Sequence, residues 1–163
     1  MKVYLASFFA DKDRVLARGN ELADMGIEVT SRWPLETAPH NASIKDFPDE
    51  YFRETAVFDI QDIIAADKLV MFVPSDTQMA DCTLRSMSRG GRHFETGFFY
   101  GLIMAARHDG SAEDDERSPQ ELIVVGPREN VFHFLDGEGA AKPFPMIRQF
   151  LTWDECKAYL GGA

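Results

Sequence analysis

The sequence is poor in the residue types that build metal sites and disulfide frameworks. It has two cysteines, Cys82 and Cys156, which lie far apart and form no C-x-x-C pair. They therefore indicate neither a zinc site nor a disulfide framework. The four histidines show no metal spacing such as H-x-x-x-H. We expect no metal site in this chain.

The sequence also lacks a surplus of basic residues and any long apolar run. With 17 Lys and Arg against 27 Asp and Glu, the formal net charge is −10. This charge disfavours polymeric nucleic acid as a partner, because binding a polyanion requires a basic face. The apolar run at the N-terminus ends at Asp11, too early for a signal peptide or a membrane span. We expect a soluble, cytoplasmic protein that does not bind membranes.

What the sequence does contain is a regular alternation of short apolar runs and helical patterns. Its 163 residues and 45% hydrophobic content fit one domain, 1–163. Strands are expected over residues 2–7, 27–30, 68–73, 121–126 and 146–150, and helices over 11–25, 49–66 and 93–107, with a last helix capped by Thr152 and Glu155. The alternation predicts an α/β, flavodoxin-like (Rossmann-like) three-layer sandwich with a five-stranded parallel sheet, order 2-1-3-4-5.

In such sheets ligands bind outside the carboxyl ends of the strands, where strands 1 and 3 separate. The loops after the first three strands, residues 7–10, 31–48 and 74–92, open at this edge. The helix carrying Glu95 follows the third strand, so Glu95 is expected there too.

Two carboxylates are candidates for chemistry at this edge. Glu95 is expected in the first turn of its helix, where the positive helix end would keep its pKa low and hold it ionised as a nucleophile. Asp59 is the candidate second acid, since paired carboxylates can split a glycosidic bond. The alternatives remain open: Glu95 could merely complement the helix dipole, and Asp59 and Asp62 could form a solvated face.

Several further residues are candidate substrate contacts. Hydroxyls, guanidinium groups and free N–H groups around the loop before Glu95 suit a phosphate or sugar; these are Ser7, Ser88, Arg89, Gly90, Gly91 and Arg92. Three aromatic residues could stack on a planar base: Phe8, Phe9 and Trp33. His93 could touch substrate or begin the helix. The alternative interpretation is a hinge loop with aromatic anchors, and no Walker A motif occurs.

Four short motifs, in order and spacing, resemble a known family. They are the strand 3–7, Asp59 followed eight residues on by Asp67 and a strand, the stretch Phe94-Glu95-Thr96-Gly97-Phe98, and Glu129-Asn130-Val131. On these motifs the chain resembles the nucleoside 2-deoxyribosyltransferase superfamily, which includes the 2'-deoxynucleoside 5'-monophosphate N-hydrolases.

The resemblance implies roles for individual residues. Glu95 falls on the nucleophile that forms a covalent ribosyl ester, and Asp59 on the carboxylate that assists at the nucleobase. Asn130 falls on a residue supplied to the neighbouring subunit's site, which implies a homodimer or larger homo-oligomer. The implied partners are a nucleoside or nucleoside 5'-monophosphate and a free nucleobase, with no cofactor.

The chain departs from the family pattern just before the nucleophile. Transferases of the family have a further carboxylate six residues earlier, where this chain has Arg89 with Ser88 beside it. An Arg and a Ser suit a 5'-phosphate better than a free hydroxyl. Base exchange is the expected activity, with hydrolysis of 5'-monophosphates as the alternative. A non-enzymatic nucleotide sensor is the alternative of another class.

Overall fold

The computed structural model describes residues 1–36, 47–74, 90–108, 120–129, 133 and 147–162. The predictions made for Ser88, Arg89 and Asn130 lie outside these residues. Most of the loops expected over 31–48 and 74–92 also fall there. None of the helices in the described ranges combines the length and apolar character needed to cross a bilayer.

The described chain is built on a five-stranded parallel sheet with the order β2-β1-β3-β4-β5. The strands are β1 (Lys2–Ala6), β2 (Glu28–Val29), β3 (Lys68–Phe72), β4 (Glu121–Val125) and β5 (Arg148–Phe150). All pairings are parallel, and Tyr4 lies opposite Leu69 in the register of β1 and β3. The predicted flavodoxin-like α/β fold and its strand order are therefore confirmed.

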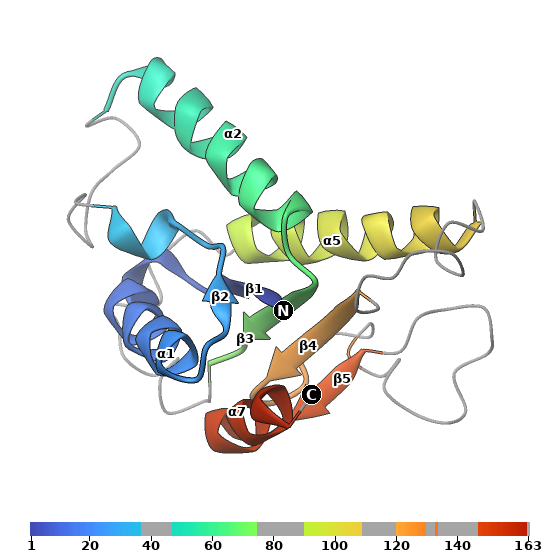
Figure 1. Ribbon diagram of the computed structural model, residues 1–163. Coiled ribbons are helices and arrows are strands. Elements are labelled where there is room, and N and C mark those ends of the chain that lie inside the picture. Colours follow the sequence, from blue (N-terminus) through green and yellow to red (C-terminus); the bar gives the residue numbers. More distant parts are fainter. Residues whose placement is uncertain (37–46, 75–89, 109–119, 130–132, 134–146, 163) are drawn as a thin grey trace.

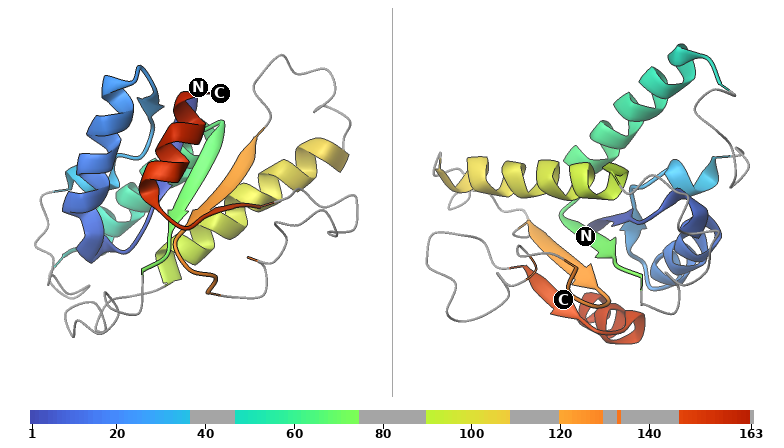
Figure 2. Two further views of the ribbon diagram at one scale, coloured as in Figure 1. Left: turned by 90° about the horizontal axis from the view of Figure 1, so that it is seen from below. Right: turned by 180° about the vertical axis from the view of Figure 1, so that it is seen from behind.

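Helices cover both faces of the sheet, as Figures 1 and 2 show. α1 (Lys12–Asp24) and α7 (Trp153–Gly161) lie on one face, and α2 (Asp49–Ile64) and α5 (Gly90–His108) on the other. Short 3-10 segments, η1 (Phe9–Asp11) and η2 (Trp33–Leu35), occupy parts of the expected loops. The predicted capping box of α7 is confirmed, because Thr152 Oγ1 accepts the Glu155 N–H at 3.3 Å. Three layers result, with every residue of β3 buried between them.

The side chains of β1 alternate between the two helical layers, as the period of a strand requires. Leu5 lies on the α1 side, where an ideal Cβ at Gly19 would stand 3.8 Å from Leu5 Cδ1. Tyr4 points the other way and reaches α5, where its hydroxyl meets Glu95. Both side chains are fully buried, so β1 anchors the core and also carries a polar group into the α5 layer.

α5 begins earlier than its sequence suggests, at Gly90 rather than His93. Glycine is a poor helix former, so the sequence at residues 90 and 91 is typical of a loop. Arg92 stabilises this first turn: its guanidinium lies 3.7 Å from the Phe8 ring centroid and pairs with Glu129. Glu95 is therefore the sixth residue of α5, in its second turn. The prediction of a first-turn position is wrong.

Candidate active site

Tyr4, Glu95 and Asp59 come together between the sheet and the α2–α5 layer. The Tyr4 hydroxyl donates to Glu95 Oε1 over 3.0 Å. The other carboxylate oxygen, Glu95 Oε2, is buried and accepts no hydrogen bond from any described residue. Asp59 is close enough for its negative charge to raise the pKa of both Glu95 and Tyr4. Three chain segments far apart in sequence thus meet at one buried carboxyl group.

The pKa of Glu95 is raised, from its ordinary 4.5 to about 7. Burial is the main cause, and the charge of Asp59 adds to it, while the hydrogen bond from Tyr4 acts in the opposite direction. The prediction that a helix N-terminus keeps this pKa low is wrong. The helix dipole acts mainly within the first turn, and Glu95 lies one turn further on, in surroundings that disfavour its charge.

The pKa of Asp59 is also raised to about 7. Burial is again the largest cause, followed by the negative charges of Glu36 and Asp62, while Arg32 lowers it. Asp62 lies one helical turn away and is only 7% exposed. Arg32 binds both Asp62 oxygens, with Nε 2.9 Å from Oδ1 and 3.0 Å from Oδ2. The alternative in which these two aspartates form a solvated face is therefore wrong.

The pKa values of Glu95 and Asp59 both lie near 7, so the two carboxyl groups hold about one proton between them at neutral pH. They can therefore provide an ionised carboxylate and a carboxylic acid, the two groups that acid-assisted nucleophilic displacement needs. The Tyr4 hydroxyl favours ionisation of Glu95, since it donates to that carboxylate. Burial and these neighbouring charges raise the pKa of Tyr4 itself, so its phenol keeps its proton and remains a donor.

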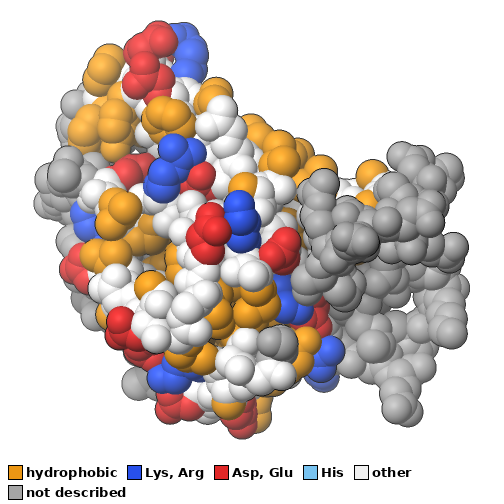
Figure 3. Space-filling view, viewed as in Figure 1, with side chains coloured by type: hydrophobic (Ala, Val, Ile, Leu, Met, Phe, Trp, Pro, Cys, Tyr) orange, Lys and Arg blue, Asp and Glu red, His pale blue; other side chains and the backbone are white. Residues whose placement is uncertain are grey.

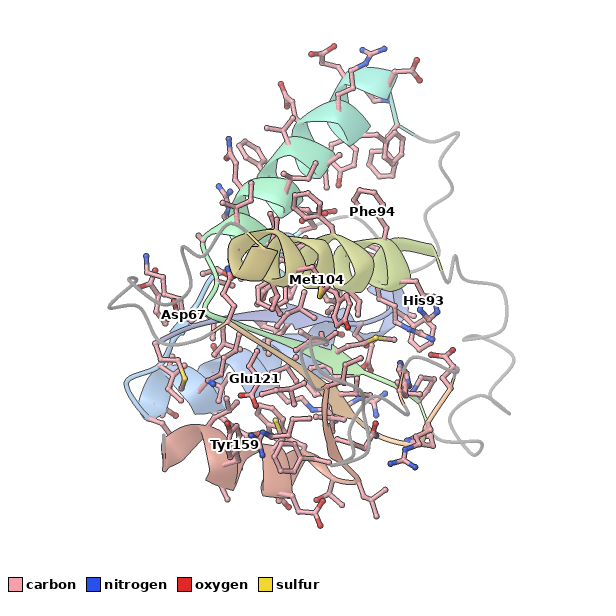
Figure 4. The ribbon with its side chains drawn as sticks, turned by 90° about the vertical axis from the view of Figure 1, so that its right-hand side faces the viewer. Asp67, His93, Phe94, Met104, Glu121 and Tyr159 are labelled. Atoms are coloured by element: carbon pink, nitrogen blue, oxygen red, sulfur yellow. The ribbon has the colours of Figure 1, made fainter. Side chains whose placement is uncertain are left out.

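Replacing Tyr4 by phenylalanine should raise the pKa of Glu95 further and reduce activity near pH 7. A hydrogen bond to a charged group contributes about 1.5–3 kcal/mol, so we expect a loss of about tenfold or more that shrinks at higher pH. A pH–rate profile measures it. The matched control is Tyr159→Phe, which removes a hydroxyl bonded to Glu121 at the opposite end of the sheet (Figure 4). A loss that is equal at every pH would contradict this role for Tyr4.

The two raised pKa values also predict how stability depends on pH. Because both exceed their ordinary values, 3.8 for Asp59 and 4.5 for Glu95, the folded chain binds more protons than the unfolded chain between about pH 4 and pH 7. The free energy of unfolding should therefore fall as pH rises through this window. Relative to Glu95→Gln, the wild type should lose about 3 kcal/mol, since one pKa unit corresponds to about 1.4 kcal/mol. Urea unfolding of both proteins at pH 4.5 and pH 8 measures this change. A free energy of unfolding that increases between pH 4.5 and pH 8, relative to Glu95→Gln, would refute the prediction.

The aromatic residues predicted to stack on a base have structural contacts instead. Trp33 is 7% exposed, and its indole N–H donates to the Leu5 carbonyl at 2.8 Å. Phe8 is 4% exposed beneath the Arg92 guanidinium, and Phe9 is half-buried with Lys12 Nζ 5.2 Å from its ring centroid. Neither Trp33 nor Phe8 offers a free ring face, so we do not include them in the proposed site.

The basic stretch before Glu95 is also partly committed to the fold. Arg92, predicted to hold a phosphate or sugar, is 2% exposed and pairs with Glu129. His93 is half-exposed, with Nε2 3.8 Å from Glu129. Figure 4 shows His93 pointing toward the carboxyl ends of the strands and Phe94 toward α2. Gly91 has open space where a side chain would lie. Of this stretch, Gly91 therefore leaves room for a ligand beside it.

Ser7, the remaining predicted substrate contact, lies directly after β1. Its hydroxyl donates to Asp11 Oδ2 at 2.9 Å, and Asp11 also accepts from Arg14 Nε at 2.6 Å. Ser7 is half-buried, so its oxygen can still accept a hydrogen bond from a ligand.

Tyr4 is not among the site residues that the sequence predicts. Its strand reads as an ordinary buried run, and a tyrosine in such a run is most simply a core residue. The available signal was that a buried phenol requires a hydrogen-bond partner, and that its partner had to come from a helix covering the sheet. Among the described side chains, no group of three His, Cys, Asp or Glu residues could hold a metal ion.

Comparisons with known proteins bear on the fold. No protein-family model matches the chain, and no curated protein does. A 2-deoxyribosyltransferase from the psychrotolerant bacterium Bacillus psychrosaccharolyticus has a similar structure, with a TM-score of 0.54 and 16% identity over 98% of this chain and 92% of that one. A conserved protein from Enterococcus faecalis V583 gives a TM-score of 0.49 and 14% identity over 97% and 95%. The chain therefore has the fold of the first of these proteins, a 2-deoxyribosyltransferase.

Proposed function

We propose that this chain cleaves the N-glycosidic bond of (2'-deoxy)nucleosides or their 5'-monophosphates and transfers the sugar to a second base. The observation that carries the proposal is the Glu95 carboxyl group. One of its oxygens is held by Tyr4, the other is buried without a hydrogen bond from the described residues, and Asp59 is near enough for its charge to raise the pKa of Glu95. Buried polar atoms are normally satisfied, so this oxygen is a fitting place for a reacting carbon.

In the first half-reaction Glu95 acts as the nucleophile. Its free oxygen attacks C1' of the sugar, and the bond from C1' to the base nitrogen breaks, with its electron pair leaving on the base. Asp59, in its protonated form, gives its proton to the departing base. The products are a free nucleobase and a sugar joined to Glu95 through an ester.

In the second half-reaction the roles reverse. The Asp59 carboxylate takes a proton from an incoming base, whose nitrogen attacks C1', and the ester bond breaks with its electrons returning to Glu95. Water in place of the base gives hydrolysis and a free sugar. Transfer and hydrolysis therefore share the first half-reaction and differ in the acceptor that the site admits.

The test is incubation with a panel of nucleosides and 5'-monophosphates, with and without a second free base. Chromatography reports base release or exchange, and intact mass reports the sugar ester. Exchange that depends on the second base supports the transferase. Release at the same rate without it supports the hydrolase. If no substrate of the panel gave base release, base exchange or a sugar adduct, the proposal would be refuted. The non-enzymatic nucleotide sensor would then be the remaining interpretation.

The contacts of Glu95 favour the enzyme over the sensor. A sensor would be expected to hold Glu95 in an ion pair with a basic residue such as Arg92. Arg92 pairs with Glu129 instead, and within the described residues Glu95 makes no ion pair. This pairing also weakens the case for Arg92 as a phosphate ligand. Recognition of a 5'-phosphate would then rest on Ser88 and Arg89.

We further propose that the chain forms a homo-oligomer in which Asn130 serves a neighbouring subunit's site, as the family resemblance implies. Exposed apolar side chains on α2 and α5 support the association. Val57, Ile64 and Phe94 are 52%, 53% and 63% exposed, and hydrophobic side chains are visible along α2 in Figure 3. Light scattering during size-exclusion chromatography gives the mass, and a monomer at micromolar concentration would refute this part of the proposal.

A further inference from the structure

A cavity of 270 Å³ lies on the other face of the sheet from Glu95. Its walls are the ends of β3, β4 and β5, the side of α1 and the start of α7. Its apolar lining includes Phe8, Phe72, Val125 and Trp153, and its polar lining includes Arg14 and Arg18. Neither Glu95 nor Asp59 contributes to it. The cavity is therefore separate from the carboxyl pair, although both lie in the same sheet-and-helix framework.

The turn after β4 shapes the floor of this cavity. Gly126 has φ +118, and a Cβ there would overlap the Val73 carbonyl oxygen. Only glycine permits this close approach of two backbone segments without strain. The Gly126 N–H also donates to the Phe150 carbonyl at 2.9 Å. The ends of three neighbouring strands are thus held together around a fixed hollow.

Arg18 is held rigidly at the wall of the cavity. Its guanidinium carbon lies 4.0 Å from the Phe72 ring centroid and 5.6 Å from that of Trp153. Within the part of the chain that the structure describes, Arg18 has no hydrogen bond and no ion pair. The neighbouring acid, Glu21, accepts from Lys157 and from the Trp153 indole N–H instead. Stacking fixes the guanidinium plane and leaves its N–H groups available to a ligand.

The charges around the cavity limit what it can bind. The lining holds the charges of Asp11, Arg14 and Arg18, which sum to one positive charge. Asp11 pairs with Arg14, whose Nε lies 2.6 Å from Oδ1, and its charge also acts on Arg18. Burial lowers the pKa of Arg18, but a guanidinium stays protonated in proteins. A net charge of one matches a monoanion, whereas the second charge of a dianion would be left without a counter-charge in the lining. A guanidinium binds a carboxylate through two parallel hydrogen bonds.

We propose that this cavity binds a small monocarboxylate with a flat apolar body. Its carboxylate binds Arg18, and its body packs against Phe72 and Trp153. The volume of 270 Å³ is just below the usual range for pockets of drug-sized ligands, so the ligand is compact. It is a second ligand, distinct from the nucleoside, and its binding does not depend on the proposed reaction.

Sodium benzoate is a suitable probe, with benzamide as its uncharged analogue. In a ¹H–¹⁵N titration of the wild type, benzoate should shift the Trp153 indole N–H with a dissociation constant of about 1 mM, as expected for so few atoms. The Trp33 indole N–H, bound to the Leu5 carbonyl, lies outside the cavity lining and should not move. Benzamide and inorganic phosphate at pH 8 should bind at least about tenfold more weakly.

Variants locate the effect on Arg18. Arg18→Gln should weaken benzoate binding at least about tenfold, whereas Arg53→Gln makes the same charge change on the exposed surface of α2 and should leave it unchanged. Glu95→Gln should also leave it unchanged, which separates this inference from the proposed reaction. Equal binding of benzoate and benzamide, equal shifts of both indoles, or full binding by a folded Arg18→Gln would overturn the proposal. If that variant does not fold, the wild-type comparison with benzamide decides alone.

Discussion

Replacing Glu95 by glutamine is expected to remove turnover while leaving the fold intact. Glutamine has nearly the same shape as glutamate and keeps an oxygen for the Tyr4 hydroxyl, whose bond to Glu95 Oε1 is 3.0 Å long. It cannot attack C1' as an anion, so we expect a loss of about 10³-fold or more, as when a nucleophile is removed. Chromatography of the released base measures the rate.

The covalent step gives this prediction a second readout. Wild-type protein mixed with substrate should gain the mass of the sugar, and Glu95→Gln should not. Glu54→Gln makes the same change on the exposed surface of α2 and should behave as the wild type in both measurements. A Glu95→Gln variant with activity near that of the wild type would rule out the mechanism. Turnover loss accompanied by a sugar adduct elsewhere on the chain would assign the nucleophile to another residue.

Replacing Asp59 by asparagine should slow the reaction in a way that depends on the leaving base. General acid catalysis contributes about 10²–10⁴-fold, so we expect a loss in that range for ordinary nucleosides. A nucleoside whose base is already cationic, such as an N7-methylated purine, needs no proton to depart. Its loss should be less than about tenfold. Comparison of kcat/KM for the two substrates measures the difference.

Two neighbours of Asp59 provide controls. Asp62→Asn breaks the paired contacts with Arg32 and should lower stability. Because the charge of Asp62 also raises the pKa of Asp59, it should in addition lower the pH at which the acid loses its proton. Glu36→Gln removes a charge that raises the pKa of Asp59. Asp59 should then lose its proton at a lower pH, so the alkaline limb of the pH–rate profile should begin at a lower pH than in the wild type. An Asp59→Asn variant that loses activity equally with both bases would show that Asp59 is not the acid.

The fold could be predicted from the sequence because its signals are local and consistent. Each buried strand is a short apolar run, and each connecting helix has either a period or a cap that marks it, as Thr152 and Glu155 mark the last one. Alternation of the two element types then leaves few parallel-sheet topologies. The strand order of the described sheet agrees with that prediction. The start of α5 was missed because Arg92, through contacts remote in sequence, overrides the poor helix propensity of two glycines.

The chemistry of the site could be predicted only in part. Motif spacing makes Glu95 and Asp59 candidates, but the sign of the Glu95 pKa shift depends on burial, which spacing does not report. A helix start displaced by three residues reversed the argument, because the dipole effect is confined to the first turn. The sequence leaves two interpretations of Trp33 open, a stacking residue and a loop anchor. The hydrogen bond from its indole N–H to the Leu5 carbonyl favours the anchor.

The position of Tyr4 in β1 has a consequence for how this protein can be altered. Its phenol belongs both to the fully buried core and to the carboxyl pair, so a substitution there changes folding and chemistry together. Engineering for a new substrate range should therefore work through the connecting segments and leave β1 unchanged. A library that randomises the strand would lose variants to misfolding before their selectivity could be judged.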